Sequence, residues 1–452
     1  FILGLILKSY STKNRISLKD SMFICSFSWI ILTIIGAIPY VVMLKTGYID
    51  ALFEAMSGFT TTGATILTGL DEMPRSILFW RAFTQWIGGL GILSMFILIG
   101  FKGGAAANKL FIAESHKIAG KKPSPGAFHT AKVLWELYIG FTLALIIILK
   151  ICGVGLFDAM THSFTTISTG GFSIYDNSIT QFQILGYQYH HIIEIVIIFF
   201  MILGGMNFFI HSRILKGDIK SLWDSTEVRY FWGIILGSTL LILISYSISK
   251  GLSYEAINGE VITGVNAVLL HLKDTIFQVV SILTTTGYAT RDINSGYFTP
   301  FAKQLFLILM LIGGCAGSTS GGFKVIRVAV LSKLAKNKIY KLNSSSFTRA
   351  PLTIDNEKIE MEEITRITVI LFLWILLLII GGAATAFFSK LSAWQSISGM
   401  FSALGNIGPS FISVQEMIEL NPIIKLVYIF GMLAGRLEIL PVLIIFNKKF
   451  FK

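Results

Sequence analysis

Four short segments rich in threonine, serine and glycine recur along the 452-residue chain. They read Thr61-Thr62-Gly63, Ser168-Thr169-Gly170, Thr285-Thr286-Gly287 and Asn406-Ile407-Gly408, and their glycines are 107, 117 and 121 residues apart. Glycine can adopt a positive φ and bring its carbonyl close to a ligand, while a preceding Thr or Ser can hold the loop by local hydrogen bonds. Four such segments around one axis would form rings of carbonyl oxygens that replace the hydration shell of a cation.

Glycine also serves close packing between membrane helices, and a single segment of this type would be weak evidence for an ion site. Four aligned segments at similar spacing favour the carbonyl-lined filter. The third segment continues into Tyr288, so Thr285-Thr286-Gly287-Tyr288 is near the Thr-Val-Gly-Tyr filter of potassium channels. We therefore expect K⁺ to bind at these segments.

The composition places the segments in a membrane. Of the residues, 54% are hydrophobic and 14% are charged, with a mean hydropathy of +0.73, whereas soluble domains are about a quarter charged. A membrane span needs about 20 apolar residues. Such runs occupy 21–44, 80–100, 131–152, 191–210, 230–249, 304–327, 365–388 and 423–445. Shorter stretches, which we expect to be re-entrant, occupy 48–65, 155–173, 273–290 and 393–410.

This pattern predicts an all-α polytopic membrane protein, in which four repeats of helix, pore loop and helix have a pseudo-fourfold arrangement around one pore. Intervals of this length are too long for a solenoid and suit duplicated membrane modules. The predicted repeats are 21–100, 131–210, 230–328 and 365–452. The predicted cytosolic loops are 101–130, 211–229 and 329–364, and residues 1–20 are interpreted as the remnant of an N-terminal helix with a cytosolic linker.

The net charge of +12 follows membrane topology and does not indicate nucleic-acid binding. Of the 37 Lys and Arg residues, 26 lie on the predicted side of the N-terminus, 10 lie on the opposite side, and Arg436 lies within a span. Because cytoplasmic loops carry the basic excess, we expect the N-terminal side in the cytoplasm and the four glycine segments near the outer face. Asp50, Asp158 and Asp274 lie near the predicted starts of three pore helices, where a negative side chain interacts favourably with the helix dipole.

A second glycine-rich run interrupts the second helix of the third repeat. Each glycine within a helix costs about 1 kcal/mol relative to Ala, so five glycines in ten residues predict a loop at mid-membrane below the filter. A flexible kink without a gating role is the alternative. The run comprises Gly313, Gly314, Cys315, Ala316, Gly317, Ser318, Thr319, Ser320, Gly321 and Gly322.

Arg436 lies in the last predicted span, where an ionisable side chain is costly and usually faces a cavity or a partner. A structural ion pair with Glu438 is one alternative, but residues i and i+2 do not face each other on a helix. We interpret Arg436 as a pore-facing cation below the filter, which acts as an electrostatic barrier and anchors the glycine-rich loop.

The chain resembles the Trk/Ktr/HKT superfamily of potassium transporters, and most closely its TrkH branch, over nearly its whole length. Apart from the four segments, the resemblance is carried by Arg81-Ala-Phe-Thr-Gln-Trp-Ile-Gly-Gly-Leu-Gly-Ile92, by Gly313-Gly-Cys-Ala-Gly-Ser-Thr-Ser-Gly-Gly-Phe-Lys324 and by Gly431-Met-Leu-Ala-Gly-Arg-Leu-Glu438. It implies an intramembrane gating loop, a cytosolic TrkA-like nucleotide-binding regulator, a homodimer and a place in the bacterial inner membrane. Gly63, where sodium-admitting relatives can carry Ser, implies a preference for K⁺.

The sequence is compatible with two transport mechanisms. The first is a gated potassium permease or channel; the alternative is a symporter that couples K⁺ to Na⁺ or protons. Acids within the spans are scarce, chiefly Glu136, Glu194 and Glu438, which favours the channel-like mechanism. An enzyme is not expected, because the spans carry no Ser/Lys dyad, paired Asp or HExxH motif, and we expect no organic cofactor.

Overall fold

The computed structural model describes residues 18–102, 127–251, 253–256, 259–342, 352–355 and 357–444. Most of the N-terminal segment 1–20 and of the loop 101–130 therefore lies outside the described residues. The predicted all-α architecture is confirmed, with two short β-hairpins as the strands of the described part.

The first two repeats each place a short pore helix between two long helices. The first repeat comprises α2 (Leu18–Leu44), α3 (Tyr48–Phe59), the 3₁₀ turn η1 (Leu70–Glu72) and α4 (Arg75–Lys102). The second comprises α6 (Ala127–Ile151), α7 (Leu156–Ile167), α8 (Thr180–Ile184), α9 (His190–Gly205) and α10 (Phe208–Ile214), and α11 (Ser221–Asp224) follows it.

The last two repeats follow the same plan with additions. The third comprises α12 (Thr226–Lys250), the antiparallel hairpin β1 (Ser253–Glu255) and β2 (Val261–Thr263), α13 (Val265–Leu283), α14 (Pro300–Ile312) and α15 (Val325–Leu342). The hairpin β3 (Thr353–Ile354) and β4 (Glu357–Lys358) follows. The fourth comprises α16 (Met361–Phe388), α17 (Ala393–Gly405), α18 (Val414–Glu419), α19 (Pro422–Arg436) and α20 (Leu440–Ile444).

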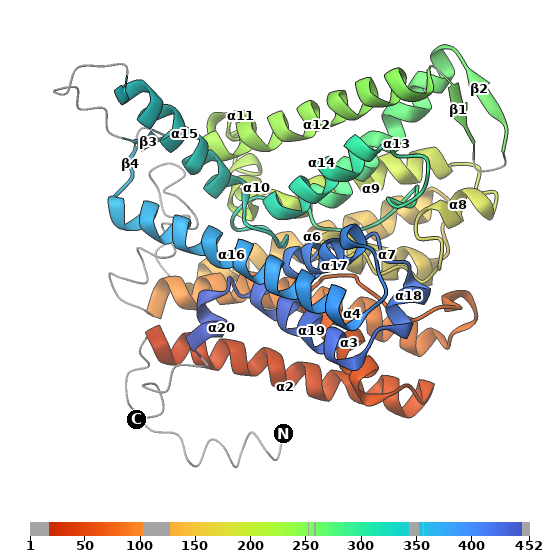
Figure 1. Ribbon diagram of the computed structural model, residues 1–452, viewed down its shortest axis with the longest axis horizontal. Helices are drawn as coiled ribbons and strands as arrows, with labels where there is room; N and C mark the ends of the chain where they lie inside the picture. The colour runs from red at the N-terminus through yellow and green to blue at the C-terminus, as the bar shows by residue number, and fades with distance from the viewer. Residues whose placement is uncertain are drawn as a thin grey trace.

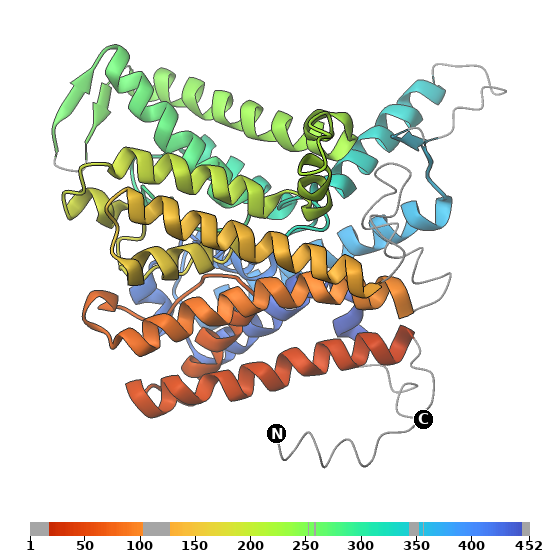
Figure 2. The ribbon, with the colours of Figure 1, turned by 180° about the vertical axis from the view of Figure 1, so that it is seen from behind.

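Packing closes the four repeats into a ring. Each pore helix packs against the second helix of the preceding repeat: α7 on α4, α13 on α9, α17 on α14, and α3 on α19. Figures 1 and 2 show the long helices side by side, with β1–β2, α8 and α18 at one end of the molecule and α15 with β3–β4 at the other. The pseudo-fourfold arrangement predicted from the sequence is therefore present.

The long helices turn apolar faces outward. On α12, Leu236, Leu240, Ile244 and Ile248 recur every four residues and are 46–80% exposed, which suits a helix face in contact with lipid. By length and composition, α2, α6, α12, α13 and α16 qualify as membrane spans. We nevertheless group α13 with the pore helices, because its C-terminal end leads into the third glycine segment in the way that α3 and α7 lead into theirs.

Three second helices are broken. The predicted interruption after Ile312 is confirmed, because helix resumes only at Val325. The continuous spans predicted at 191–210 and 423–445 are wrong. Helices α9 and α10 meet at an angle of 105°, and α19 ends at Arg436, after which Glu438 and Ile439 have positive φ.

The acids expected near the starts of pore helices fall into two groups. Asp50 and Asp158 lie in the first turns of α3 and α7, as predicted, although neither helix has a side-chain cap hydrogen bond. The prediction for Asp274 is wrong, because α13 begins nine residues earlier, at Val265. The capping box of Ser392 and Gln395 starts the fourth pore helix, α17, instead.

We expect residues 66–79 and 291–300 to lie outside the cell, and 103–128 and 335–360 in the cytosol. The test is cysteine labelling of intact cells with a membrane-impermeant maleimide. The exposed positions Glu72 and Lys338 suit single-cysteine variants, in a background where Cys25 and Cys152 are replaced and the fully buried Cys315 is kept. Glu72→Cys should be labelled and Lys338→Cys should not. The reverse pattern would overturn the topology.

Candidate functional site

The four pore helices end in the same backbone structure. The first residue past each helix end or cap, namely Thr61, Thr169, Thr285 and Asn406, has a positive φ of 51–57°. The N–H of this residue donates to the carbonyl three residues earlier. The N–H of the residue after it donates to the carbonyl five positions before itself, at 2.8–3.1 Å. This is the Schellman arrangement, which usually places glycine at the left-handed position. Threonine there is strained, and such strain persists mainly at functional sites.

We call the residues after these helices the filter segments: segment 1 is 60–63, segment 2 is 168–171, segment 3 is 284–287 and segment 4 is 405–408. The structure corrects the sequence alignment of segment 2 by one residue. Gly171, with φ of 75°, occupies the place of Gly63, Gly287 and Gly408. Gly170 therefore corresponds to Thr62, Thr286 and Ile407, and Ser168 corresponds to Thr60 and Thr284.

The four segments form a closed ring. In each of the first three segments, a Cβ atom built on the positive-φ glycine would lie 2.2 Å or less from a carbonyl oxygen of the following repeat. The pairs are Gly63 with the Gly170 carbonyl, Gly171 with the Thr286 carbonyl, and Gly287 with the Ile407 carbonyl. The fourth closes the circle, because a Cβ on Gly408 would lie 2.7 Å from the carbonyl oxygen of Thr62. No side chain fits at these positions, so backbone carbonyls of neighbouring repeats approach one another around one centre.

All four positive-φ glycines line a single cavity of about 1010 Å³, which also contacts the connections that follow the filter segments. Its lining includes the charged residues Asp176, Glu255 and Arg291. Asp176 of the second repeat accepts hydrogen bonds from the backbone N–H groups of Gly69 (2.8 Å) and Leu70 (3.2 Å) of the first repeat. The cavity therefore lies at one mouth of the ring, and hydrogen bonds between the first two repeats cross-link its rim.

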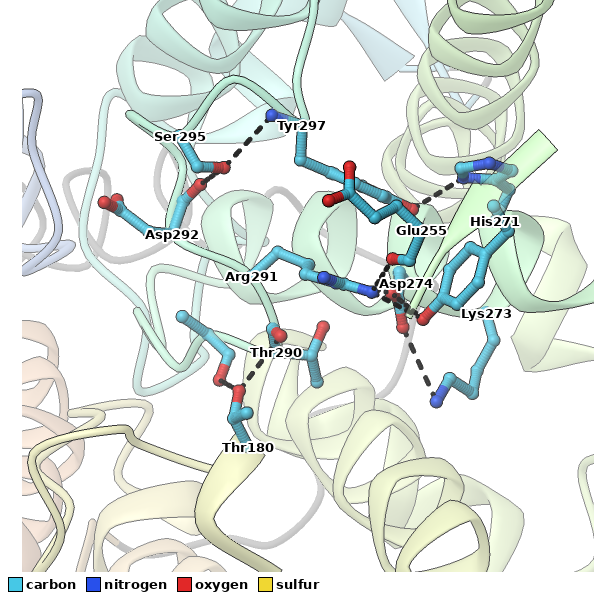
Figure 3. A network of polar contacts seen from close by, with 12 residues as sticks. Thr180, Glu255, His271, Lys273, Asp274, Thr290, Arg291, Asp292, Ser295 and Tyr297 are labelled. Carbon is cyan, nitrogen blue, oxygen red and sulfur yellow. Dashed lines mark hydrogen bonds and ion pairs between the residues drawn. The ribbon is translucent and has the colours of Figure 1, made fainter. Parts of the chain in front are cut away.

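A polar network fixes the part of this rim that belongs to the third repeat (Figure 3). Arg291 donates to Asp274 (3.2 Å), to the Tyr254 hydroxyl (2.8 Å) and to the Glu255 carbonyl (2.7 Å). Lys273 also lies 3.5 Å from the Asp274 carboxylate. Asp274 thus holds Arg291, which follows segment 3, and ties the β1–β2 hairpin to the pore helix.

A buried ion pair supports the segments of the first two repeats. The Arg81 Nε lies 2.8 Å from Glu54 Oε1, and both residues are 1% exposed. Glu54 also accepts from the Thr65 hydroxyl at 3.0 Å, while Arg81 donates to the Ser173 carbonyl at 2.8 Å. The sequence places Arg81 in a motif that carries the family resemblance but does not predict its ion pair with Glu54, because nothing local pairs residues 27 positions apart.

The glycine-rich run Gly313–Gly322 forms a loop that closes on itself. The N–H groups of Phe323 and Lys324 donate to the carbonyls of Leu311 and Ile312, at 2.9 and 2.7 Å. The loop contacts the filter segments directly. The Thr319 hydroxyl lies 3.3 Å from the hydroxyl of Thr169 in segment 2 and donates to the carbonyl of Ile167, the last residue of α7, at 2.9 Å. The N–H of Gly321 donates to the hydroxyl of Thr285 in segment 3 at 2.7 Å.

Three charged side chains hold this loop. Glu227 of α12 accepts from the N–H of Ala316 at 2.7 Å, Lys324 donates to the Ser320 carbonyl at 2.5 Å, and Arg436 donates to the Thr319 carbonyl at 2.6 Å. All three are nearly fully buried. Arg436 also donates to the Gly88 carbonyl at 3.2 Å, so it links the loop to α4 of the first repeat.

The buried acids differ from those expected. The Glu136 side chain is 62% exposed, beside Lys132. Glu194 is buried next to Lys273, and Glu438 pairs with Arg327 at 2.5 Å. Glu227 was missed, because it lies three residues before the predicted start of its span. Among the described residues no group of three or more His, Cys, Asp or Glu side chains could hold a metal ion.

The comparisons with known proteins cover nearly the whole chain. The family model TrkH, described as a cation transport protein, matches residues 2–451. The Trk system potassium uptake protein TrkH of Salmonella typhimurium is 31% identical over 445 residues, which are 97% of this chain and 87% of the relative. A protein of Methanocaldococcus jannaschii, described as an uncharacterized cation transporter, is 32% identical over 457 residues, which are 100% of this chain and 87% of the relative.

The fold agrees with a solved structure. The crystal structure of the potassium transporter TrkH from Vibrio parahaemolyticus matches with a TM-score of 0.82 and 28% identity, covering 97% of this chain and 87% of that one. With its apolar helices, the chain is a multi-pass protein of the bacterial inner membrane and a transporter, not an enzyme. Since the family model matches almost every residue, the chain belongs to the TrkH family of cation transport proteins.

Proposed function

We propose that this chain carries K⁺ into the cell through the ring of filter segments, with the loop Gly313–Gly322 as its gate. The observation that supports the proposal most strongly is the closed ring, in which each positive-φ glycine leaves room only for a carbonyl of the next repeat. Relatives named as potassium uptake proteins support the choice of ion.

The chemistry of the ring suits a monovalent cation. Neutral carbonyl oxygens can replace a hydration shell without the charge of a carboxylate, so a bound ion can still leave. The pore helices point their C-terminal ends, which carry partial negative charge, toward the ring. The proposed K⁺-binding residues are three from each segment. They are Thr61, Thr62 and Gly63, Thr169, Gly170 and Gly171, Thr285, Thr286 and Gly287, and Asn406, Ile407 and Gly408.

Replacing Gly63 by serine should reduce the preference for K⁺ over Na⁺. Gly63 has φ of 81°, and its Cβ would collide with the Gly170 carbonyl, so a serine must displace part of the ring. The measurement is rubidium uptake by cells or proteoliposomes in competition with sodium. We expect Na⁺ to compete at least about tenfold better in the variant, since one disturbed hydrogen bond or ion contact is worth roughly that factor.

Gly155→Ser is the matched control. Gly155 precedes α7 with an ordinary φ of −56°, where serine is a favourable N-cap residue. This variant should keep the wild-type competition. If both serine variants changed selectivity equally, the special role of Gly63 would be rejected.

The gate proposal rests on the buried contacts of the loop with two filter segments and three charged side chains. Shortening the loop by several residues within Cys315–Ser320 removes the contacts of Ala316 with Glu227 and of Thr319 with Arg436. We therefore expect higher rubidium flux per folded transporter and weaker control by the regulator. An unchanged flux at normal membrane expression would leave the loop as a passive kink.

Arg436 should act as an electrostatic barrier as well as an anchor. Its permanent charge repels a cation beneath the ring, and repulsion grows as the local dielectric constant falls. Arg436→Ala should raise rubidium flux without abolishing selectivity, and Arg436→Lys should lie between, since lysine keeps the charge but loses the planar fork. Flux is normalised to correctly folded protein. Lower normalised flux in the alanine variant would contradict the barrier.

A route for regulation also follows from the contacts. Asp355, between β3 and β4, accepts hydrogen bonds from the N–H and the hydroxyl of Thr226, at 2.8 and 2.6 Å. The next residue, Glu227, holds Ala316 of the loop. A cytosolic TrkA-like nucleotide-binding regulator that displaced the β3–β4 hairpin would thus act on the loop through two adjacent residues. We propose such a regulator, and a homodimer, as the working assembly.

A further inference from the structure

The filter segments share a backbone but differ in the side chain just before the positive-φ glycine. In segments 1 and 3 this residue is a threonine, and its hydroxyl pairs with that of the threonine two residues earlier: Thr62 with Thr60 at 2.7 Å, and Thr286 with Thr284 at 2.8 Å. Segment 2 has Ser168 at the earlier position but Gly170 at the later one. Segment 2 therefore lacks the hydroxyl pair that braces segments 1 and 3.

The carboxamide of Gln85 occupies the missing side chain's place. A Cβ atom built on Gly170 would lie 2.4 Å from Cδ and Oε1 of Gln85, and its three nearest neighbours are all atoms of that side chain. Gln85 is fully buried. Its Nε2 donates to the Gly170 carbonyl at 2.7 Å, and its Oε1 accepts from the Phe172 N–H at 3.0 Å. The two bonds hold the backbone on both sides of Gly171.

Arg81 extends this brace by one helical turn. It precedes Gln85 by four residues on α4, so the two side chains lie on the same helix face. The Arg81 guanidinium lies 4.2 Å from the centre of the Phe172 ring and donates to the Ser173 carbonyl. Together, Gln85 and Arg81 of the first repeat contact three residues of the second repeat. Gln85 bonds the Gly170 carbonyl and the Phe172 N–H, and Arg81 contacts the Phe172 ring and the Ser173 carbonyl.

We propose that Gln85 is a positioning residue for ion selectivity, which replaces from a neighbouring repeat the hydroxyl brace that segment 2 lacks. The inference rests on the proposed filter function. Its chemical requirement is narrow, because the side chain must present a donor to the Gly170 carbonyl and an acceptor to the Phe172 N–H at the same time. Among side chains of this length only glutamine does both at any pH.

The direct test is Gln85→Leu, which keeps the approximate volume and removes both bonds, and Gln85→Glu, whose ionised form lacks the donor. We expect Na⁺ to compete with rubidium uptake about tenfold better in Gln85→Leu and, at a pH where the introduced carboxyl is ionised, in Gln85→Glu. A tenfold change corresponds to about 1.4 kcal/mol, the order of one to two net hydrogen bonds. Rubidium flux at zero Na⁺, normalised to folded protein, should change much less, because Gln85 does not block the path.

Gln278 provides the matched control. It is also a fully buried glutamine, on α13, but neither atom of its carboxamide has a hydrogen-bond partner in the part of the chain that the structure describes. Gln278→Leu should keep the wild-type competition by Na⁺. A general loss of packing would affect both leucine variants, whereas loss of the brace affects only Gln85→Leu.

A rescue experiment tests the replacement itself and serves also if Gln85→Leu does not fold. Gly170 has no positive φ, so its backbone accepts a side chain once Gln85 is shortened. The double variant Gln85→Ala/Gly170→Thr would rebuild a hydroxyl pair with Ser168, as in segments 1 and 3. It should recover at least about half of the selectivity lost in Gln85→Ala, whereas Gly170→Thr alone collides with Gln85 and should impair selectivity.

These outcomes distinguish a failure of the proposed role of Gln85 from a failure of the proposed filter function. Loss of selectivity in Gln85→Leu with recovery in the double variant supports the brace. Wild-type selectivity in Gln85→Leu and Gln85→Glu, combined with reduced selectivity in Gly63→Ser, overturns the brace and leaves the filter intact. Wild-type selectivity in all of these variants, Gly63→Ser included, overturns the filter function and with it this inference.

Discussion

The close approach of backbone to backbone between neighbouring repeats is the constraint on which the structure depends. At four positions a carbonyl oxygen of one repeat lies where the Cβ of the preceding repeat would be, so those positions must be glycine with positive φ. Irregular backbone at membrane depth is tolerated only when it is buried in protein or lines a cavity. The ring of long helices, with each pore helix packed on the preceding repeat, provides that burial for four non-helical segments at once.

The four repeats share a backbone plan but differ in their side chains. The side chains that differ between repeats lie mainly around the Gly313–Gly322 loop of the third repeat. The loop is held from the third repeat by Glu227 and from the fourth by Arg436. It also meets the break of α9 and α10, where the Phe208 N–H donates to the Gly317 carbonyl at 3.1 Å. A fourfold ring can thus present similar carbonyls to an ion, while repeat-specific residues carry the parts that would close or brace it.

The sequence predicts those elements that are determined by residues close together in the chain. Apolar runs predict the long helices, and five glycines in ten residues predict the interruption after Ile312, because both effects act within one stretch of chain. The register of segment 2 was missed, because Gly170 and Gly171 are adjacent and only the fold shows which one has positive φ. The breaks near Asn207 and Leu437 were missed although Gly204-Gly205 precedes the first and Pro441 follows the second, because each break lies within an otherwise continuous apolar run. The roles of Glu54, Gln85 and Glu227 were out of reach, since their partners come from distant segments.

The central claim is that the ring of filter segments binds K⁺, and ion density tests it most directly. Crystals grown in rubidium in place of potassium would be measured at the rubidium absorption edge. Anomalous density is expected within the ring, between the cavity that the four positive-φ glycines line and the Gly313–Gly322 loop, and it should disappear when sodium replaces rubidium. Rubidium density found elsewhere, with none within the ring, would contradict it.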